Sequence, residues 1–196
     1  MRKIIFFDTE TTGLPKYYNA PISQLYNWPR LVQLAFIEYY EDGSLAAKHN
    51  YIIRPEGFTI PQSATLIHRI SHEKARSEGH SLKEVLNIFQ QASNEAAILI
   101  AHNFDFDKSI IGAEFLRNSM DLQSFLNKRS FCTMKDQNII NFCQIRGTNG
   151  LKWPKLEDLY WKIFQEKMPE AHDAFFDTQA TARCFWELLI RGIIKA

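Results

Sequence analysis

The chain has 196 residues, of which 45% are hydrophobic and 23% charged; this composition is typical of a folded domain and excludes disordered, collagen-like and low-complexity proteins. Lysine and arginine together number 23 and aspartate and glutamate 22, so the formal net charge is +1. A chain this close to neutrality is not a coat for long nucleic acid, which needs many basic contacts with phosphates, but a local patch could bind a short stretch.

The cysteines and the apolar segments indicate the cellular compartment of the protein. Three cysteines, an odd number without zinc-binding spacing, favour a reducing compartment. The apolar run at the N-terminus is too short for a signal peptide, and no run approaches the length of a membrane span. We therefore expect a cytoplasmic protein with no membrane association.

The first part of the chain predicts three strands. Residues 3–7 form a short, continuous apolar run, which indicates a buried central strand. Residues 31–40 and about 46–54 predict two further strands, and the turn residues 41–44 separate them. We expect these three strands to form an antiparallel meander.

Helical signals dominate the rest of the chain. A short helix is expected at 63–70, a second one is capped by Ser71, and a third opens with a capping box of Ser81 and Glu84 and continues to about residue 92. The later elements are strands at 97–101 and 130–133, helices at 105–118, 135–143, 156–164 and 173–191, and a loop at 147–150. This order predicts an α/β fold, a mixed sheet flanked by helices, in a single domain over residues 1–196.

Two carboxylates follow the first predicted strand. Asp8 and Glu10 are two residues apart, and residues with this spacing point to the same face of a strand. They would converge at the carboxyl edge of the sheet, where α/β proteins tend to place ligands. For an isolated Asp-x-Glu, solvated turn chemistry is the more common explanation.

A second acidic segment, Ala-His-Asn-Phe-Asp-Phe-Asp at 101–107, leads from a predicted strand into a helix. Asp107 would lie in the first helical turn, at the same sheet edge if this strand is parallel to the first. Helix capping by Asn103 or Asp105 explains the segment at least as well.

The third candidate pair lies at the start of the last predicted helix. His172 and Asp177 are five residues apart, so they would not share a face of one helix. If both serve one site, His172 must lie on the loop before the helix. A surface histidine beside a capping aspartate is the simpler alternative.

Four carboxylates brought together would repel one another unless cations neutralise them. Oxygen ligands suit Mg²⁺ or Mn²⁺ rather than zinc. Two such ions about 3.5–4 Å apart can hold the attacking and leaving oxygens of a phosphoryl displacement. A nearby histidine can accept the proton of the attacking water.

The segments FFDTETTGL, AHNFDFD and HDAFFD resemble, in this order, the three motifs of the DEDDh exonucleases, the DnaQ-like group that includes the proofreading epsilon subunit of bacterial DNA polymerase III. The resemblance implies an RNase H-like fold with a five-stranded sheet in the order 3-2-1-4-5. It also implies hydrolysis from a 3′ end that releases nucleoside 5′-monophosphates. By position, it implies two divalent ions, Mg²⁺ or Mn²⁺, held by Asp8, Glu10, Asp107 and Asp177, with His172 as the general base.

The resemblance also suggests contacts with the substrate. It places Thr11 at the terminal 3′-hydroxyl, Leu14 against the last base and His68 at the terminal nucleotide. The sequence departs from the family at Arg69, where glycine is usual, which leaves the local backbone open. Asp105 then lies outside the metal site.

Residues 15–30 form a long link between the first two strands, and this link is rich in aromatic residues. Its aromatics could stack on bases and its basic residues could hold phosphates, or the aromatics could pack on the protein's own surface. We expect it to border the substrate cleft, because it begins one residue after Leu14.

The expected partner is a nucleic-acid 3′ end, with single-stranded DNA favoured, and a DNA polymerase or repair protein is a candidate partner. The last predicted helix ends close to Ala196, without the polymerase-binding tail usual in proofreading subunits, so a stand-alone enzyme is equally expected. Two alternatives stay open: an exoribonuclease of the same fold, and a non-cleaving module that binds nucleic acid or docks on a polymerase.

Overall fold

The computed structural model describes residues 1–148, 150–169 and 173–195. At its centre is a five-stranded sheet in the order β3-β2-β1-β4-β5, which confirms the order implied by the resemblance. The strands are β1 (Lys3–Thr11), β2 (Leu31–Tyr40), β3 (Leu45–Ile52), β4 (Ala96–Ala101) and β5 (Ser130–Cys132). The first three form the predicted antiparallel meander, and β4 and β5 continue the sheet in parallel to β1.

The helices agree with the predicted ranges to within a few residues. They are α1 (Gln62–His68), α2 (His72–Glu78), α3 (Leu82–Glu95), α4 (Phe104–Arg117), α5 (Gln123–Leu126), α6 (Gln137–Cys143), α7 (Leu156–Phe164) and α8 (Ala174–Ile190). The short α5 was not predicted. The predicted loop at 147–150 overlaps a small hairpin of β6 (Arg146–Gly147) and β7 (Gly150–Leu151), and its residue 149 lies outside the described residues.

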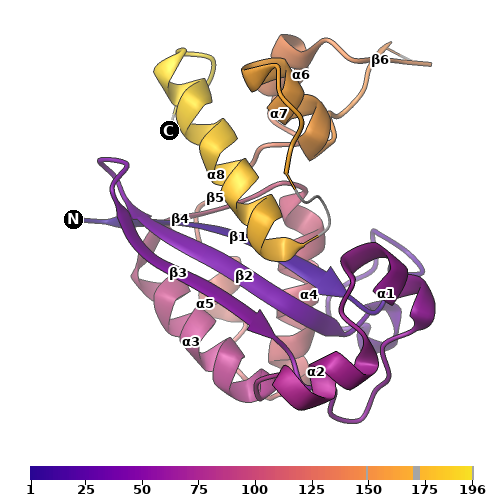
Figure 1. The fold of residues 1–196 in the computed structure, drawn as a ribbon. Helices are drawn as coiled ribbons and strands as arrows, with labels where there is room; N and C mark the ends of the chain where they lie inside the picture. The colour runs from indigo at the N-terminus through magenta and orange to yellow at the C-terminus, as the bar shows by residue number, and fades with distance from the viewer. Residues whose placement is uncertain (149, 170–172, 196) are drawn as a thin grey trace.

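The sheet is covered on both faces, and each face has its own hydrophobic core. Helices α3, α4 and α5 lie against one face, while α8, with α6 and α7 beside it, covers the other (Figure 1). Alternation along β1 assigns its side chains to the two cores: Phe7 contacts Phe104 of α4, and Phe6 contacts Phe185 of α8. The side chains of β1 continue to alternate between the two faces toward the carboxyl end of the strand.

Two helix starts were predicted from capping residues, with different outcomes. Ser71 caps α2, because its hydroxyl accepts a hydrogen bond from the Lys74 amide at 3.0 Å. The capping box at Ser81 is wrong, since the Ser81 side chain makes no capping bond. The predicted apolar face of α3 is nevertheless buried, and this burial stabilises the helix: Leu82, Val85, Leu86 and Phe89 are all at most 5% exposed.

Two further predictions concern the cysteines and the membrane. The three cysteines, Cys132, Cys143 and Cys184, are free thiols. None of the described helices combines the length and the apolar character that a membrane crossing needs.

Candidate active site

β1 continues four residues beyond the predicted end and carries the first two acids within the strand. Asp8 and Glu10 therefore follow Phe6 on the face that α8 covers, and Thr9 follows Phe7 on the face that α4 covers. The expectation that Asp8 and Glu10 share one face agrees with this geometry. The strand extends because β2 pairs with it as far as Thr11.

Asp177 reaches the same place from α8. One ligand atom from each of Asp8, Glu10 and Asp177 lies within 4.8 Å of the others. The first turn of α8 is fixed on the sheet by Gln33 of β2, whose side chain accepts a hydrogen bond from the Ala174 amide at 3.2 Å and donates one to Asp173 at 3.4 Å. We call Asp8, Glu10 and Asp177 the acidic cluster.

Asp107 approaches from the opposite face of the sheet. It lies in the first turn of α4 and is 2% exposed. Its Oδ1 accepts hydrogen bonds from the hydroxyl of Thr9 at 2.7 Å and from the Thr9 amide at 3.1 Å. Thr9 thus joins the fourth predicted acid to the strand that carries the first two.

Burial and the neighbouring carboxyl groups shift the pKa values of three of these acids. Burial, followed by the charges of Asp107, Asp177 and Glu10, raises the pKa of Asp8 well above its usual range. Burial and the neighbouring acids raise the pKa of Glu10 to about 8. Burial raises the pKa of Asp107 to about 7, although its hydrogen bonds from Thr9 oppose the shift. The site therefore gathers more negative charge than it can hold ionised without cations.

The predicted general base, His172, lies outside the described residues. Its neighbour Asp173 is the N-cap of α8, and its carboxylate accepts a hydrogen bond from the Phe175 amide at 2.9 Å. Asp173 is thus the capping aspartate that the sequence predicted beside His172 in the simpler of the two alternatives.

The three predicted substrate-binding residues lie around the carboxyl end of β1, of which Thr11 is the last residue. Thr11 is buried, and its hydroxyl donates to the Gly13 carbonyl at 2.6 Å, which closes a turn and leaves the Leu14 side chain 73% exposed. His68 is buried beside the Thr11 backbone; burial lowers its pKa, and the contact with Thr11 opposes that shift. Thr11 and His68 therefore lie together, although they are far apart in the sequence.

Helix α1 ends at His68, two residues before the predicted end, and the residue that follows is Arg69 rather than the usual glycine. Arg69 ends α1 in the left-handed conformation, with φ of 62°, and its amide donates to the Thr65 carbonyl at 2.8 Å. Left-handed backbone is the conformation for which glycine is favoured. Arg69 therefore stands where the family usually has glycine, and it adopts the left-handed backbone that glycine favours.

Two other polar residues of the second motif lie outside the acidic cluster. Asp105 is exposed and pairs with Lys135 at 2.7 Å. His102 contacts the Thr133 hydroxyl at 2.9 Å and the Pro154 carbonyl at 3.2 Å. Burial lowers the pKa of His102 to about 4, so this histidine is neutral at physiological pH.

Sequence reasoning missed two residues that position the acids. Thr9 stands between the two acids of the first motif, and the alternation of the strand placed it on the other face. Gln33 is an uncharged polar residue, only 2% exposed, within the apolar strand β2. A buried amide in such a strand is a signal, because it needs hydrogen-bond partners.

Comparison with known proteins identifies the family. The family model described as "Exonuclease" matches residues 5–185. The chain is 26% identical over 181 residues to the PolC-type DNA polymerase III of Streptococcus sanguinis, covering 91% of this chain and 10% of that protein. It is 29% identical over 151 residues to the epsilon subunit of DNA polymerase III from Buchnera aphidicola, covering 75% of this chain and 54% of that one.

The fold is similar to that of Exonuclease I from E. coli, solved with a dT13 oligonucleotide, with a TM-score of 0.76 at 19% identity. That match covers 96% of this chain and 41% of Exonuclease I. The chain thus spans only part of each of these proteins. The chain belongs to the DnaQ-like 3′–5′ exonuclease family.

Proposed function

We propose that the protein is a metal-dependent 3′–5′ exonuclease that hydrolyses terminal phosphodiesters of nucleic acid, with single-stranded DNA favoured, and releases nucleoside 5′-monophosphates. The observation that carries the proposal is the convergence of Asp8, Glu10 and Asp177 within 4.8 Å, with Asp107 tied to the same strand through Thr9. The family supports the reaction, and the oligonucleotide bound to Exonuclease I supports the substrate class.

The acidic cluster and Asp107 would hold two divalent ions, Mg²⁺ or Mn²⁺. The donors are all carboxylate oxygens, which suit these ions, and burial together with mutual repulsion raises the pKa values of Asp8 and Glu10 in the metal-free protein. Bound ions would neutralise this charge and activate a water for attack on phosphorus. A structurally similar Exonuclease I has been solved in a zinc-bound form with single-stranded DNA, which supports a divalent-metal site.

The remaining roles fall to residues around the cluster. We propose that His172 removes the proton of the attacking water, which places the chain in the DEDDh subclass. Thr11 and His68 would hold the terminal nucleotide, and Leu14 would press against its base, because its exposed side chain projects from the turn that follows Glu10. We further propose that residues 1–196 act as one exonuclease domain, and the polymerase relatives support association with a DNA polymerase.

The direct test is to incubate the purified protein with 5′-labelled single-stranded DNA, blunt duplex DNA and RNA, in Mn²⁺ and in EDTA. We expect progressive shortening from the 3′ end in Mn²⁺, fastest on single-stranded DNA, and none in EDTA. Internal cleavage, or cleavage that survives EDTA and the Asp8→Asn substitution, would contradict the proposal. Faster shortening of RNA would favour the exoribonuclease.

His172 is tested separately. His172→Ala should lower kcat by about 10²- to 10⁴-fold, the usual contribution of a general base. The wild-type rate should rise with pH as the histidine loses its proton, and the variant should lack this rise. A wild-type profile that is flat from pH 5 to 9 would argue against the role.

A further inference from the structure

A second cavity continues from the cleft that contains the acidic cluster. The first, of about 510 Å³, is lined by Asp8 and Asp177 together with Asn103 and Met134. The second, of about 550 Å³, is also lined by Asn103 and Met134. Because the two cavities share these residues, they adjoin, and a strand whose phosphate lies at the acidic cluster could continue into the second cavity.

The second cavity has exposed aromatic walls from two distant segments. Tyr18, from the link between β1 and β2, is 60% exposed, and Trp153, from the segment before α7, is 56% exposed. Exposed aromatic faces of this kind are the surfaces on which unpaired bases stack. We call this cavity, whose lining includes Tyr18, Asn103, Asp105, Met134, Lys135 and Trp153, the aromatic groove.

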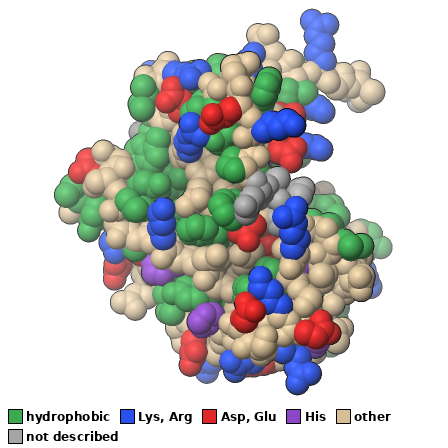
Figure 2. Space-filling model, in the orientation of Figure 1, with side chains coloured by type: hydrophobic (Ala, Val, Ile, Leu, Met, Phe, Trp, Pro, Cys, Tyr) green, Lys and Arg blue, Asp and Glu red, His purple; other side chains and the backbone are tan. Residues whose placement is uncertain are grey.

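The aromatic groove carries one lysine beside its tryptophan. Lys135 Nζ lies 4.9 Å from the centroid of the Trp153 ring and 2.7 Å from Asp105 Oδ2. The ammonium group is thus held at the groove, where it can contact a phosphate. Figure 2 shows lysine and arginine interspersed with acids over the face in view.

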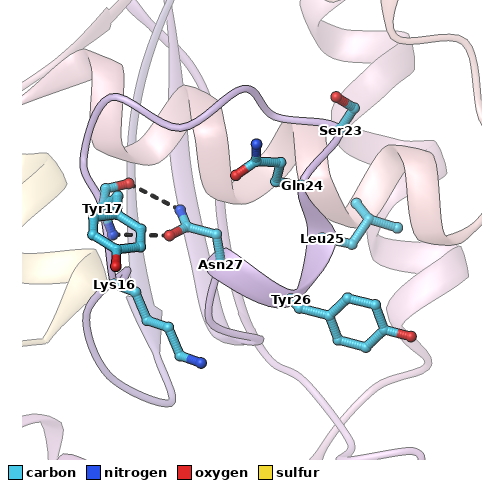
Figure 3. A pocket seen from close by; sticks show the side chains of 7 residues that line it. All are labelled: Lys16, Tyr17, Ser23, Gln24, Leu25, Tyr26 and Asn27. Atoms are coloured by element: carbon cyan, nitrogen blue, oxygen red, sulfur yellow. Dashed lines mark hydrogen bonds between the residues drawn. The ribbon is translucent and has the colours of Figure 1, made fainter.

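The link that supplies Tyr18 is held in place before any substrate binds. Asn27 exchanges two hydrogen bonds with the Tyr17 backbone, at 2.8 and 2.9 Å (Figure 3). Arg117 of α4 donates to the carbonyls of Leu25 at 2.6 Å and of Trp28 at 2.8 Å. A fixed aromatic wall needs little ordering on binding, which favours affinity.

We propose that the aromatic groove binds the unpaired nucleotide upstream of the scissile phosphate, by stacking its base on Tyr18 and Trp153 and contacting its phosphate with Lys135. The inference rests on the proposed exonuclease function and deepens it, because stacking requires that the strand is unpaired at this position. A cavity of about 550 Å³ has the size of a site for one small-molecule unit such as a nucleotide.

Binding tests the groove without any need for hydrolysis. Fluorescence anisotropy of a labelled twelve-residue oligo-dT is measured in EDTA with wild type, Tyr18→Ala, Trp153→Ala and Tyr18→Phe. Tyr18→Ala and Trp153→Ala should each weaken binding about tenfold, within the range for the loss of one stacked base, and Tyr18→Phe should bind like wild type. Unchanged binding in both alanine variants, with circular dichroism intact, would overturn the inference.

The same link provides a matched control. Tyr26 is fully exposed and lines a separate cavity with Lys16 and Tyr17 (Figure 3). Tyr26→Ala should leave oligonucleotide binding at the wild-type value. A tenfold loss in this variant as well would show that any exposed aromatic of the link contributes, and it would overturn the assignment to the aromatic groove.

A hydrolysis assay distinguishes the contribution of the aromatic groove from that of the acidic cluster. The p-nitrophenyl ester of thymidine 5′-monophosphate has the terminal nucleotide but no nucleotide upstream. The kcat/KM for oligo-dT divided by that for the ester should fall about tenfold in Tyr18→Ala and Trp153→Ala. An unchanged ratio would contradict the groove, whereas a wild type that cleaves neither substrate contradicts the proposed function and leaves the binding result to decide the groove.

Discussion

The hydroxyl of Thr9 and the carboxylate of Asp107 form a 2.7 Å hydrogen bond across the face of the sheet opposite the acidic cluster. The Thr9 amide donates to the same oxygen at 3.1 Å. Since Thr9 stands between Asp8 and Glu10 in β1, this pair of bonds sets the position of Asp107 relative to the other acids.

Thr9→Val should therefore weaken metal binding without removing any carboxylate. Valine keeps the shape of threonine and the backbone bond but loses the hydroxyl, and the loss of a partner that orients a metal ligand typically costs about 10- to 100-fold in affinity. Calorimetric titration with Mn²⁺ measures the change. Thr9→Ser, which keeps the hydroxyl, should bind within a few-fold of wild type, and equal affinity in all three proteins would contradict this role.

Asp8→Asn should abolish hydrolysis and also raise the melting temperature of the metal-free protein at pH 7.5. The substitution removes one of several mutually repelling buried carboxyl groups, and burial of ionised carboxylates opposes folding. Calorimetry in EDTA measures the melting temperature. Glu84→Gln, on the exposed side of α3, removes the same charge far from the cluster, and an equal rise in this control would exclude local repulsion as the cause.

Stability of the metal-free protein should fall as the pH rises from 6.5 to 8. The pKa values of Glu10, about 8, and Asp107, about 7, lie above those of the unfolded chain, so the folded state holds protons that the unfolded state has lost. The free energy of unfolding then decreases as these protons leave. Below pH 6.5 the lowered pKa values of His102 and His68 make the free energy of unfolding rise with pH, because the unfolded state then binds more protons than the folded state.

Urea unfolding in EDTA at several pH values measures this slope. Glu10→Gln should reduce the slope, and saturating Mn²⁺ should remove most of the loss because it stabilises the ionised carboxylates. A stability that is constant or rising over this interval in EDTA would show that the carboxyl groups titrate normally in the folded protein.

Glu114→Gln should destabilise the protein by about 3–5 kcal/mol, the usual cost when one partner of a buried ion pair is removed. The Glu114 carboxylate is fully buried, with Arg30 at 2.8 Å and Arg117 at 2.9 Å, and it accepts a hydrogen bond from the Leu31 amide at 3.1 Å. Urea unfolding measures the loss. Limited trypsin digestion should also cut faster at Lys16, because Arg117 fixes the link; unchanged cleavage would argue against that connection.

Arg69→Gly should stabilise the protein by about 0.5–1 kcal/mol. Arginine in left-handed backbone costs about 1–2 kcal/mol, and the greater freedom of glycine in the unfolded chain offsets part of the gain. Thermal unfolding measures the change. Arg69→Ala retains the backbone cost and should show no such gain, so equal stabilisation by alanine would assign the effect to the lost side chain.

The sequence by itself determined the elements and the types of residue at the site. The residue pattern predicted β2 and α7 at their observed ends: β2 is a long apolar run that turn residues follow, and α7 has one buried face. Strand alternation placed Asp8 and Glu10 on one face, and the motif resemblance supplied the sheet order and Asp177. The end of β1 was wrong, because pairing with β2, rather than the local apolar run, determines where that strand stops.

Only the tertiary structure decided how the acids are held and what lies beside them. Thr9 bonds Asp107 because β1 and α4 pack together, and Gln33 fixes the start of α8 because β2 lies beneath it; both contacts join segments about 100 residues apart or more. The sequence of the link at 15–30 did not show which of its aromatic residues are buried and which are exposed. Trp28 is buried, and Tyr18 is exposed in the aromatic groove. Contacts between distant segments depend on packing, and local sequence does not encode packing.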